Sequence, residues 1–433
     1  MRHIKFLNAA CATALALTFA TACADEEPTV VVEEPPPPAV TEPVAPVTPA
    51  EPVAPPAAGD AGSLVVWVDE TREGPVREAA DRYEAANPGT HIELVQKNFG
   101  DIRGDFVAQV PTGEGPDVTV CAHDWTGELV ANGVAAPIEL GNARNDYEDV
   151  AIGAFTWDGQ VYAVPYAIEN IALIRNVDLA PEAPTTWDEM IEIGNAAGTQ
   201  FPMLIQVTEN GDPFHMYPFQ TSFGAPVFEQ NPDGSYTNTL ALGGANGEAF
   251  ANWLAEQGAE GNLSIDVTYD IALDNFNQGN SPFVIGGPWM LSGFEDVDNI
   301  AIDPVPSAGG QTASPFVGVQ GFCLSAQSQN ALVANDFLVN YIGTPEVQVA
   351  LAAAGDRPPA LTAAQSTAFA ADPNGFMEGF SRVGADGVPM PSIPEMGQVW
   401  AFWGVTQADI IEGVADPAAR WNQMVSDIQA AID

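Results

Sequence analysis

The chain has 433 residues, of which 58 are acidic and 12 are Lys or Arg, and its formal net charge is −46 at pH 7. A field of this sign repels nucleic acid and anionic lipid, which excludes both as partners. We interpret the acidity as a solubility trait of a protein bathed in salty medium. The alternative is a calcium site, but the sequence has no Asp-x-Asp-x-Asp-Gly loop.

The first 22 residues have the pattern of a secretory signal peptide. Arg2 and Lys5 form a basic start, residues 9–20 are apolar, and small residues precede Cys23. The apolar run is too short to span a bilayer. Small residues before a cysteine are typical of a lipobox, in which Cys23 becomes the lipidated first residue of the mature protein. Ala20 stands where leucine is usual, so ordinary signal-peptidase cleavage is the alternative.

Residues 23–62 are predicted to be this cysteine and a disordered tether. Residues 24–62 contain 11 prolines and 8 acidic residues, with no Lys or Arg. This composition buries too little apolar surface to fold, and proline favours extended chain. We therefore expect an exported protein, lipid-anchored on the outer side of the cytoplasmic membrane, at the cell surface or in the periplasm.

The body opens with alternating strand and helix patterns. Residues 64–68 are a continuous apolar run, as a buried parallel strand requires. Pro75 suits the first turn of the helix that follows, and two further strands are predicted at residues 91–95 and 118–121. Such alternation indicates an α/β fold with ligand groups at the carboxyl ends of the strands. About 370 residues exceed one core, so two lobes are expected.

Cysteine and histidine usage argues against a metal site. Cys121 and Cys323 each end an apolar strand-like run, and a disulfide and two buried thiols are both compatible with export. His123 precedes Asp124, but no further histidines have the spacing of metal ligands. We expect neither a metal nor a cofactor.

Two features suggest a ligand with flat apolar faces and polar edges. Glu169 is the one carboxylate in the mostly apolar run 162–174, where an unpaired acid would be costly to bury; an exposed strand end is the alternative. Near the C-terminus, two prolines in residues 390–396 precede Trp400, Phe402 and Trp403. A sugar ring suits such aromatics, although an aromatic-rich core helix is the alternative.

The body resembles the maltose/maltodextrin-binding proteins of sugar ABC transporters, within the larger class of extracellular solute-binding proteins. The resemblance rests on seven stretches in family order. These are LVVWV at 64–68, GEGPD at 113–117, AHD at 122–124, PYAIE at 165–169, GGPW at 286–289, PFVGV at 315–319 and MPSIPEM at 390–396.

This resemblance implies a class II periplasmic-binding-protein-like α/β fold of two lobes, joined by crossing hinge strands and closing over a sugar. One lobe would be residues 63–168 plus 320–370, and the other 171–317 plus 376–433. Cys121 and Cys323 would then lie in the same lobe, which makes a disulfide plausible.

The resemblance also implies the substrate-binding residues, which combine acids and a base with large aromatics. They are Glu70, Arg72, Asp124, Trp125, Glu169, Asp212, Phe214, Tyr217, Trp289, Met390, Trp400 and Trp403. Carboxylates would accept hydrogen bonds from sugar hydroxyls while aromatics cover the ring faces. Trp125 and Gly404 stand where the best-known member has arginine, and Cys121 stands where it has tryptophan. These departures leave the preferred sugar open.

The expected function is therefore capture of maltose- or maltodextrin-type oligosaccharide and its delivery to the permease subunits of an ABC transporter. We expect a monomer that catalyses no reaction. One alternative is the same fold binding a different neutral solute. Another is an anchored glycoside hydrolase, which needs two carboxylates across a sugar site, a weak criterion in a chain with 58 acids.

The charge predicts that salt stabilises the folded protein. Screening weakens the repulsion among the acidic residues of the folded body more than in the expanded unfolded chain. The melting temperature should therefore rise by several degrees between low salt and about 1 M salt, measured by circular dichroism. A melting temperature that stays constant over this range would contradict the prediction.

Overall fold

The computed structural model describes residues 62–231, 235–294, 297 and 299–433. The predicted signal peptide, Cys23 and residues 24–61 of the predicted tether lie outside these residues and stay predictions. Within the described part of the chain, no helix combines the length and the apolar character that crossing a bilayer requires.

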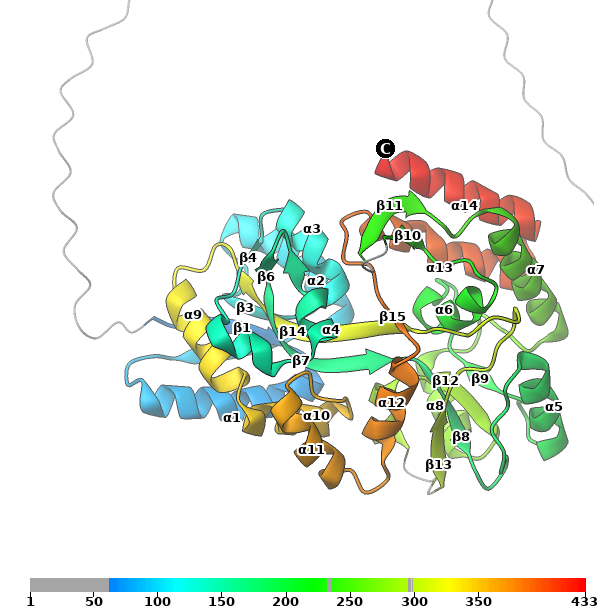
Figure 1. Ribbon diagram of the computed structural model, residues 1–433, viewed down its shortest axis with the longest axis horizontal. Helices are drawn as coiled ribbons and strands as arrows, with labels where there is room; N and C mark the ends of the chain where they lie inside the picture. Colours follow the sequence, from blue (N-terminus) through cyan, green and yellow to red (C-terminus); the bar gives the residue numbers. More distant parts are fainter. Residues whose placement is uncertain (1–61, 232–234, 295–296, 298) are drawn as a thin grey trace, which may run out of the picture. The chain divides into compact units, whose positions relative to one another are not determined.

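The described residues place seven strands in the sheet of the first lobe (Figure 1). These strands are β1 (Leu64–Val68), β2 (Ile92–Gln96), β3 (Val118–Ala122), β4 (Ala135–Ala136), β7 (Ala163–Asn170), β14 (Phe316–Ser325) and β15 (Val388–Pro389). β1 pairs in parallel with β2 and β3, which confirms the buried parallel strand predicted at residues 64–68. β14 runs antiparallel to both β3 and β7.

The first three helices of the first lobe follow strands: α1 (Glu70–Ala86) after β1, α2 (Phe99–Gln109) after β2, and α3 (Thr126–Ala131) after β3 by way of the turn η2 (His123–Trp125). The other helices are α4 (Asp149–Ala154), α9 (Ala331–Phe337), α10 (Pro345–Gly355) and α11 (Thr362–Ala371), with the short 3-10 helices η1 (Val110–Thr112) and η3 (Gly141–Asp146) and the π-helix η5 (Leu338–Ile342). The prediction that Pro75 lies in the first turn of α1 is wrong. The carboxylate of Asp69 accepts the backbone N–H groups of Thr71 and Arg72, so this cap starts the helix earlier.

The second lobe has its own four-stranded sheet in the order β13-β8-β12-β9. The strands are β8 (Ala172–Asn176), β9 (Leu204–Ile205), β12 (Phe283–Gly286) and β13 (Ile300–Asp303). The helices are α5 (Trp187–Ala197), α6 (Pro213–Ser222), α7 (Gly244–Glu260), α8 (Tyr269–Asn277), α12 (Phe376–Gly384), α13 (Met396–Glu412) and α14 (Pro417–Ile432), with the turn η4 (Pro288–Gly293).

Two hairpins complete the fold: β5 (Thr156–Trp157) with β6 (Gln160–Val161), and β10 (Phe228–Gln230) with β11 (Tyr236–Leu240). In the first hairpin Asp158 and Gly159 connect the two strands, a residue pair that favours such turns. Asp158 and Gly159 both have positive φ, 48° and 79°, as a two-residue turn of this kind requires.

The antiparallel strands β7 and β14 lie side by side and extend to the second lobe (Figure 1). Beyond β7 the chain enters β8 of the second sheet within two residues. One hydrophobic core draws on residues 64–167 and 319–364, and another on residues 171–316 and 390–428. The lobe boundaries predicted from the sequence stay a prediction.

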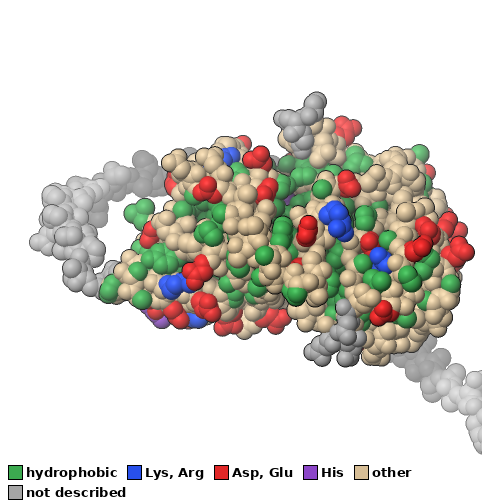
Figure 2. Space-filling model, turned by 60° about the horizontal axis from the view of Figure 1, so that its bottom comes forward, with side chains coloured by type: hydrophobic (Ala, Val, Ile, Leu, Met, Phe, Trp, Pro, Cys, Tyr) green, Lys and Arg blue, Asp and Glu red, His purple; other side chains and the backbone are tan. Residues whose placement is uncertain are grey.

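Acidic side chains are spread over the face shown in Figure 2, where basic ones are few. Several of the acids in the described part of the chain do have partners, such as Asp303 with Arg175 and Asp409 with Arg420. On the face shown, acidic side chains therefore outnumber basic ones.

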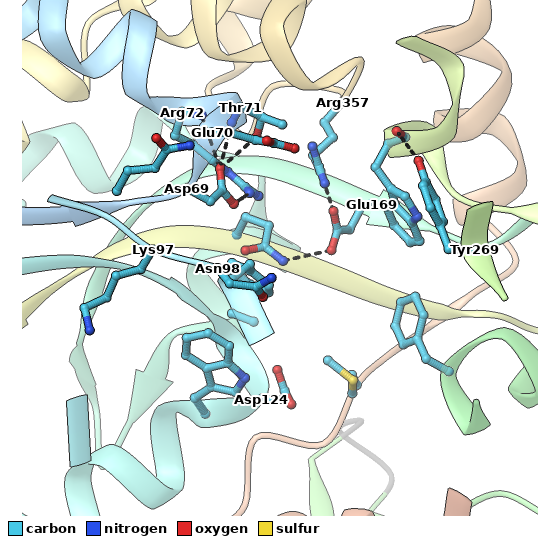
Figure 3. Close-up of a pocket in the computed structure, with 18 of the residues that line it drawn as sticks. Asp69, Glu70, Thr71, Arg72, Lys97, Asn98, Asp124, Glu169, Tyr269 and Arg357 are labelled. Atoms are coloured by element: carbon cyan, nitrogen blue, oxygen red, sulfur yellow. Dashed lines mark hydrogen bonds and ion pairs between the residues drawn. The ribbon is translucent and has the colours of Figure 1, made fainter. Parts of the chain in front are cut away.

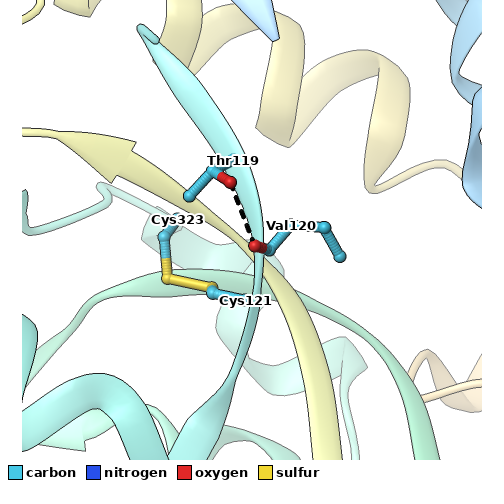
Figure 4. Close-up of a disulfide and its surroundings, with 4 residues drawn as sticks. All are labelled: Thr119, Val120, Cys121 and Cys323. Carbon is cyan, nitrogen blue, oxygen red and sulfur yellow. Dashed lines mark hydrogen bonds between the residues drawn. A yellow bond between two sulfur atoms is a disulfide. The ribbon is translucent and has the colours of Figure 1, made fainter. Parts of the chain in front are cut away.

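Cys121 and Cys323 form a disulfide between β3 and β14 (Figure 4). The two strands are neighbours, with Cys121 opposite Gly321 and Cys323 opposite Thr119. Both sulfur-bearing side chains are buried. Of the two alternatives that the sequence left open, the structure contains the disulfide.

This disulfide closes a loop of 202 residues, so it should strongly restrict the unfolded chain. Replacing both residues (Cys121→Ala with Cys323→Ala) should lower the free energy of unfolding by about 2–5 kcal/mol, measured by urea denaturation. The reduced wild-type protein loses the cross-link without losing side-chain atoms and should show a similar decrease. Equal urea midpoints for oxidised and reduced wild type would contradict the prediction.

Candidate functional site

A cavity of about 820 Å³ lies where the two lobes meet (Figure 3). From the first lobe it is lined by residues at strand ends and on adjoining turns: Asp69, Glu70, Thr71, Arg72, Gln96, Lys97, Asn98, Phe99, Ala122, Asp124, Trp125, Glu169, Gln320 and Arg357. From the second lobe it is lined mostly by aromatic residues: Phe214, Tyr269, Trp289, Met390 and Trp400.

Most of the residues proposed from the sequence line this one cavity. They are Glu70, Arg72, Asp124, Trp125, Glu169, Phe214, Trp289, Met390 and Trp400. They come from segments more than 300 residues apart in the chain, which the fold brings together. Their role as ligand contacts stays a proposal.

The structure places Asp212, Tyr217 and Trp403 outside the cavity lining. The Asp212 carboxylate caps α6 by accepting the backbone N–H of His215, and it also pairs with the His215 ring at 2.9 Å. Tyr217 is buried with its ring stacked 3.5 Å from Phe316. Trp403 is fully buried and donates its indole N–H to Gln220. Tyr217 and Trp403 belong to the core of the second lobe and Asp212 is the cap of α6, so none of the three lines the cavity.

Asp124 follows the carboxyl end of β3, in the turn η2. The Trp400 side chain hydrogen-bonds its carboxylate, but its Oδ1 atom is shielded from water and has no hydrogen-bond partner. Burial raises the pKa of Asp124 to about 7, against the opposing charge of Arg103. A shielded acceptor without a donor indicates a place for a hydroxyl or amide group of a ligand.

Glu169 lies on β7 and is held by two donors. Arg357 Nε contacts one carboxylate oxygen at 2.5 Å, and Gln320 Nε2 donates to the other at 2.8 Å. Burial by itself would raise the pKa of Glu169, but the charge of Arg357 and these hydrogen bonds outweigh it and hold the pKa below its usual value. Gln320 Oε1 is a second buried acceptor without a partner.

Each cation that lines the cavity is already paired with a carboxylate of the protein. Arg72 pairs with Asp69, and its guanidinium lies 5.2 Å from the ring centre of Phe99. Lys97 pairs with Asp105, and Arg357 pairs with Glu169. The cavity therefore offers no unpaired cation among the residues described, and an anionic ligand would have to displace an existing ion pair.

Aromatic rings face the cavity from both lobes. In the first lobe Trp125 lies 5.1 Å from Phe99, with the ring planes 32° apart. In the second lobe Phe214 and Trp289 lie 6.1 Å apart, and Tyr269 donates its hydroxyl to the backbone carbonyl of Trp289. Rings on both sides suit a ligand with two apolar faces and polar edges.

His123 is buried behind this site, with no role as a metal ligand. Its Nδ1 accepts the backbone N–H of Val319, so the proton is on Nε2, which donates to the carbonyl of Met390. One neutral ring thus ties η2 to β14 and to the segment of Met390. In the residues described, no group of three or more His, Cys, Asp or Glu side chains is arranged to hold a metal ion.

Several lining residues were not predicted. Lys97, Asn98 and Phe99 directly follow β2, so the rule that ligand groups gather at the carboxyl ends of parallel strands would have found them. Arg357 and Tyr269 carry no such signal, because their positions follow from contacts between distant parts of the chain.

The chain matches the family model described as bacterial extracellular solute-binding protein over residues 78–378. It is 25% identical over 393 residues to a galactooligosaccharide-binding protein of Bacillus subtilis (strain 168), covering 85% of this chain and 89% of that protein. It is 24% identical over 392 residues to a maltooligosaccharide ABC transporter solute-binding lipoprotein of Streptococcus pneumoniae (strain ATCC BAA-255 / R6), covering 86% and 90%.

Among solved structures, the maltotriose binding protein of Thermus thermophilus, bound with maltotriose, superimposes with a TM-score of 0.76 at 30% identity. The match covers 86% of this chain and all of that one. The fold is the two-lobed periplasmic-binding-protein fold. The chain belongs to the bacterial extracellular solute-binding protein family.

The raised pKa of Asp124 predicts a pH dependence of stability. The folded state keeps a proton that the unfolded state loses at its ordinary pKa of 3.8, so stability falls as pH rises from about 4 to about 7. Asp124→Asn removes this loss. Between pH 4 and pH 8 the free energy of unfolding of Asp124→Asn should therefore rise, relative to that of wild type, by on the order of 1–2 kcal/mol. The expected difference is this small because the side chain of Asp124 is partly exposed, and solvent screens its charge.

Urea denaturation at pH 4, 6 and 8 measures the effect. Glu182→Gln, which neutralises an exposed acid of the second lobe, is the matched control and should follow wild type at all three values. A difference between Asp124→Asn and wild type that is independent of pH would refute the assignment of the titrating group.

Proposed function

We propose that this protein captures neutral oligosaccharides of the maltodextrin type in the cavity between its lobes and delivers them to the permease of an ABC transporter. One observation carries the proposal. Two buried oxygen atoms without hydrogen-bond partners, Asp124 Oδ1 and Gln320 Oε1, belong to residues that line a cavity walled by Phe214, Trp289 and Trp400. Hydroxyl groups supply the missing donors, and sugar rings cover aromatic faces.

The pairing of the cavity's cations favours a neutral solute. Arg72, Lys97 and Arg357 each contact a protein carboxylate, so a phosphorylated or carboxylated sugar would meet no unpaired positive charge among the described lining residues. The net charge of the whole chain also repels anions. A neutral sugar is insensitive to this field.

The size of the cavity supports an oligosaccharide. At about 820 Å³ it lies in the upper part of the usual range for ligand sites, roughly 300–1,000 Å³. The relatives bind maltotriose, maltooligosaccharides or galactooligosaccharides by their names. We infer an α-glucan because the solved relative, which is 30% identical, is bound with maltotriose.

Delivery to a membrane transporter fits the N-terminal sequence. The signal peptide, Cys23 and the proline-rich tether of residues 24–62 support export and lipid anchoring, and one relative is named as a transporter lipoprotein. The tether would let the body reach a neighbouring permease while staying at the membrane surface.

The named relatives are binding proteins, and we propose binding without hydrolysis for this chain as well. A glycosidase needs one carboxyl group that holds a proton and a second that stays ionised. Arg357 and Gln320 hold Glu169 in its ionised form, so it is not the acid that protonates a leaving group, while each of its oxygens can still accept a hydrogen bond from a sugar hydroxyl. We infer that ligand binding shifts the balance between open and closed lobes and that no bond of the sugar is cleaved.

Isothermal titration calorimetry with maltose, maltotriose, a cyclodextrin and a galactooligosaccharide tests the proposal. We expect heat and a thermal shift with maltotriose. Heat with the galactooligosaccharide alone would change the proposed substrate from an α-glucan to a galactooligosaccharide. No response to any saccharide would overturn the proposed function. Release of reducing sugar during incubation would favour the hydrolase alternative.

Variants of the cavity should weaken maltotriose binding while the protein stays folded. Glu169→Gln and Trp400→Leu should each raise Kd by roughly 10- to 100-fold, because each removes a hydrogen-bond acceptor or a stacking face. Tyr217→Phe is the control, since Tyr217 lies in the core outside the lining. An equal change in Kd for Tyr217→Phe would show that core packing and not the lining decides affinity.

A further inference from the structure

Arg357 is a lining residue that no local sequence pattern indicates, and its backbone is held beside Glu169. Asp356 ends α10 in the left-handed conformation, with φ of 53°. The next residues then follow β7: Ile168 donates its N–H to the carbonyl of Pro358, and Ala360 donates to the carbonyl of Tyr166. Arg357 is therefore held at a set position along the strand that carries Glu169.

The Arg357 side chain is buried and reaches the Glu169 carboxylate. Its Nε contacts Glu169 Oε2 at 2.5 Å, and its Nη1 donates to the carbonyl of Gly355 at 3.0 Å. The two side chains are only 8% and 9% exposed. Gln320 holds the other oxygen of Glu169, so the orientation of this acid is fully determined within the first lobe (Figure 3).

The same guanidinium also contacts the second lobe. Its central carbon lies 5.7 Å from the ring centre of Trp289, within the distance of a cation–π contact. Trp289 lies in η4, packs against the core residues of the second lobe, and has Phe214 and His215 as ring neighbours. One side chain of the first lobe thus joins the acid of one wall to the aromatic face of the other.

We propose that Arg357 is a positioning residue of this cavity, which couples Glu169 to Trp289 so that acid and stacking face meet one saccharide ring only when the lobes are in contact. The proposal rests on the proposed function for its ligand. Glu169 would accept hydroxyl groups in a fixed orientation, and Trp289 would cover the apolar face of the same ring. Removing Arg357 leaves a buried carboxylate without its charge partner and weakens the contact between lobes.

A purely structural role for Arg357 can be separated from this coupling, because the chain contains a matched pair. Arg175 contacts Asp303 through Nε at 2.7 Å and donates Nη1 to the carbonyl of Ala180 at 2.8 Å. This pair is also largely buried, but it lies within the second lobe and does not line the cavity. Loss of Arg175 should cost stability without touching the ligand or the contact between lobes.

The experiment compares Arg357→Met, Arg357→Lys and the control Arg175→Met in the full chain. Calorimetry with maltotriose gives Kd, and small-angle X-ray scattering of the ligand-free protein gives its radius of gyration. Arg357→Met should raise Kd roughly tenfold or more and increase the radius of gyration. Arg357→Lys keeps the positive charge beside Glu169 and should recover part of the affinity. It should not recover all of it, because lysine lacks the planar guanidinium that contacts Trp289.

Arg175→Met should lower the melting temperature while Kd and radius of gyration stay as in wild type. If Arg357→Met matches Arg175→Met in both Kd and scattering, Arg357 is a structural residue and the proposal is overturned. If wild type binds no saccharide, the proposed function fails, and the scattering of the ligand-free variants still decides: an unchanged radius of gyration overturns the coupling. Should Arg357→Met fail to fold, the same comparison of Arg357→Lys with wild type decides.

Discussion

The pairing of β7 with β14 is the interaction on which the site depends. Its register sets Gly318 opposite Glu169, and β14 pairs on its other edge with β3, whose carboxyl end leads to Asp124. A Cβ atom at Gly318 would lie 3.0 Å from the Cγ of Glu169, so glycine leaves the room that this acid needs. A single strand therefore positions both Asp124 and Glu169, and the same strand extends to the second lobe.

The distribution of charge separates the surface from the cavity. The chain carries 12 Lys and Arg residues against 58 acids, and three of these scarce cations, Arg72, Lys97 and Arg357, line one cavity. Each is held by a carboxylate, so the cations orient acids and stack on rings but add no unpaired charge. A strongly acidic protein can in this way keep a binding site that is close to neutral, which suits a solute that carries no charge.

Helix geometry decides which aromatics of the C-terminal segment face the ligand. A helix turns about 100° per residue, so Trp403 points about 60° away from Trp400 on α13. This difference puts Trp403 in the core against Gln220 and leaves Trp400 at the edge, beside Asp124. The close approach of α3 completes the arrangement: Gly127 donates its N–H to the carbonyl of Ser392 in the proline-containing segment, where a side chain on Gly127 would not fit.

The sequence by itself determined the α/β class, the buried strand at residues 64–68 and nine of the residues that line the cavity. Apolar runs and family stretches are patterns of neighbouring residues, so they can be recognised in the sequence without knowledge of tertiary packing. Tertiary structure alone decided that Asp212 caps α6, that Tyr217 and Trp403 belong to the core, and that Arg357 and Tyr269 belong to the cavity. A side chain's neighbours depend on register and helix rotation, and Arg357 reaches Glu169 only because its segment is hydrogen-bonded along β7, 188 residues away in the chain.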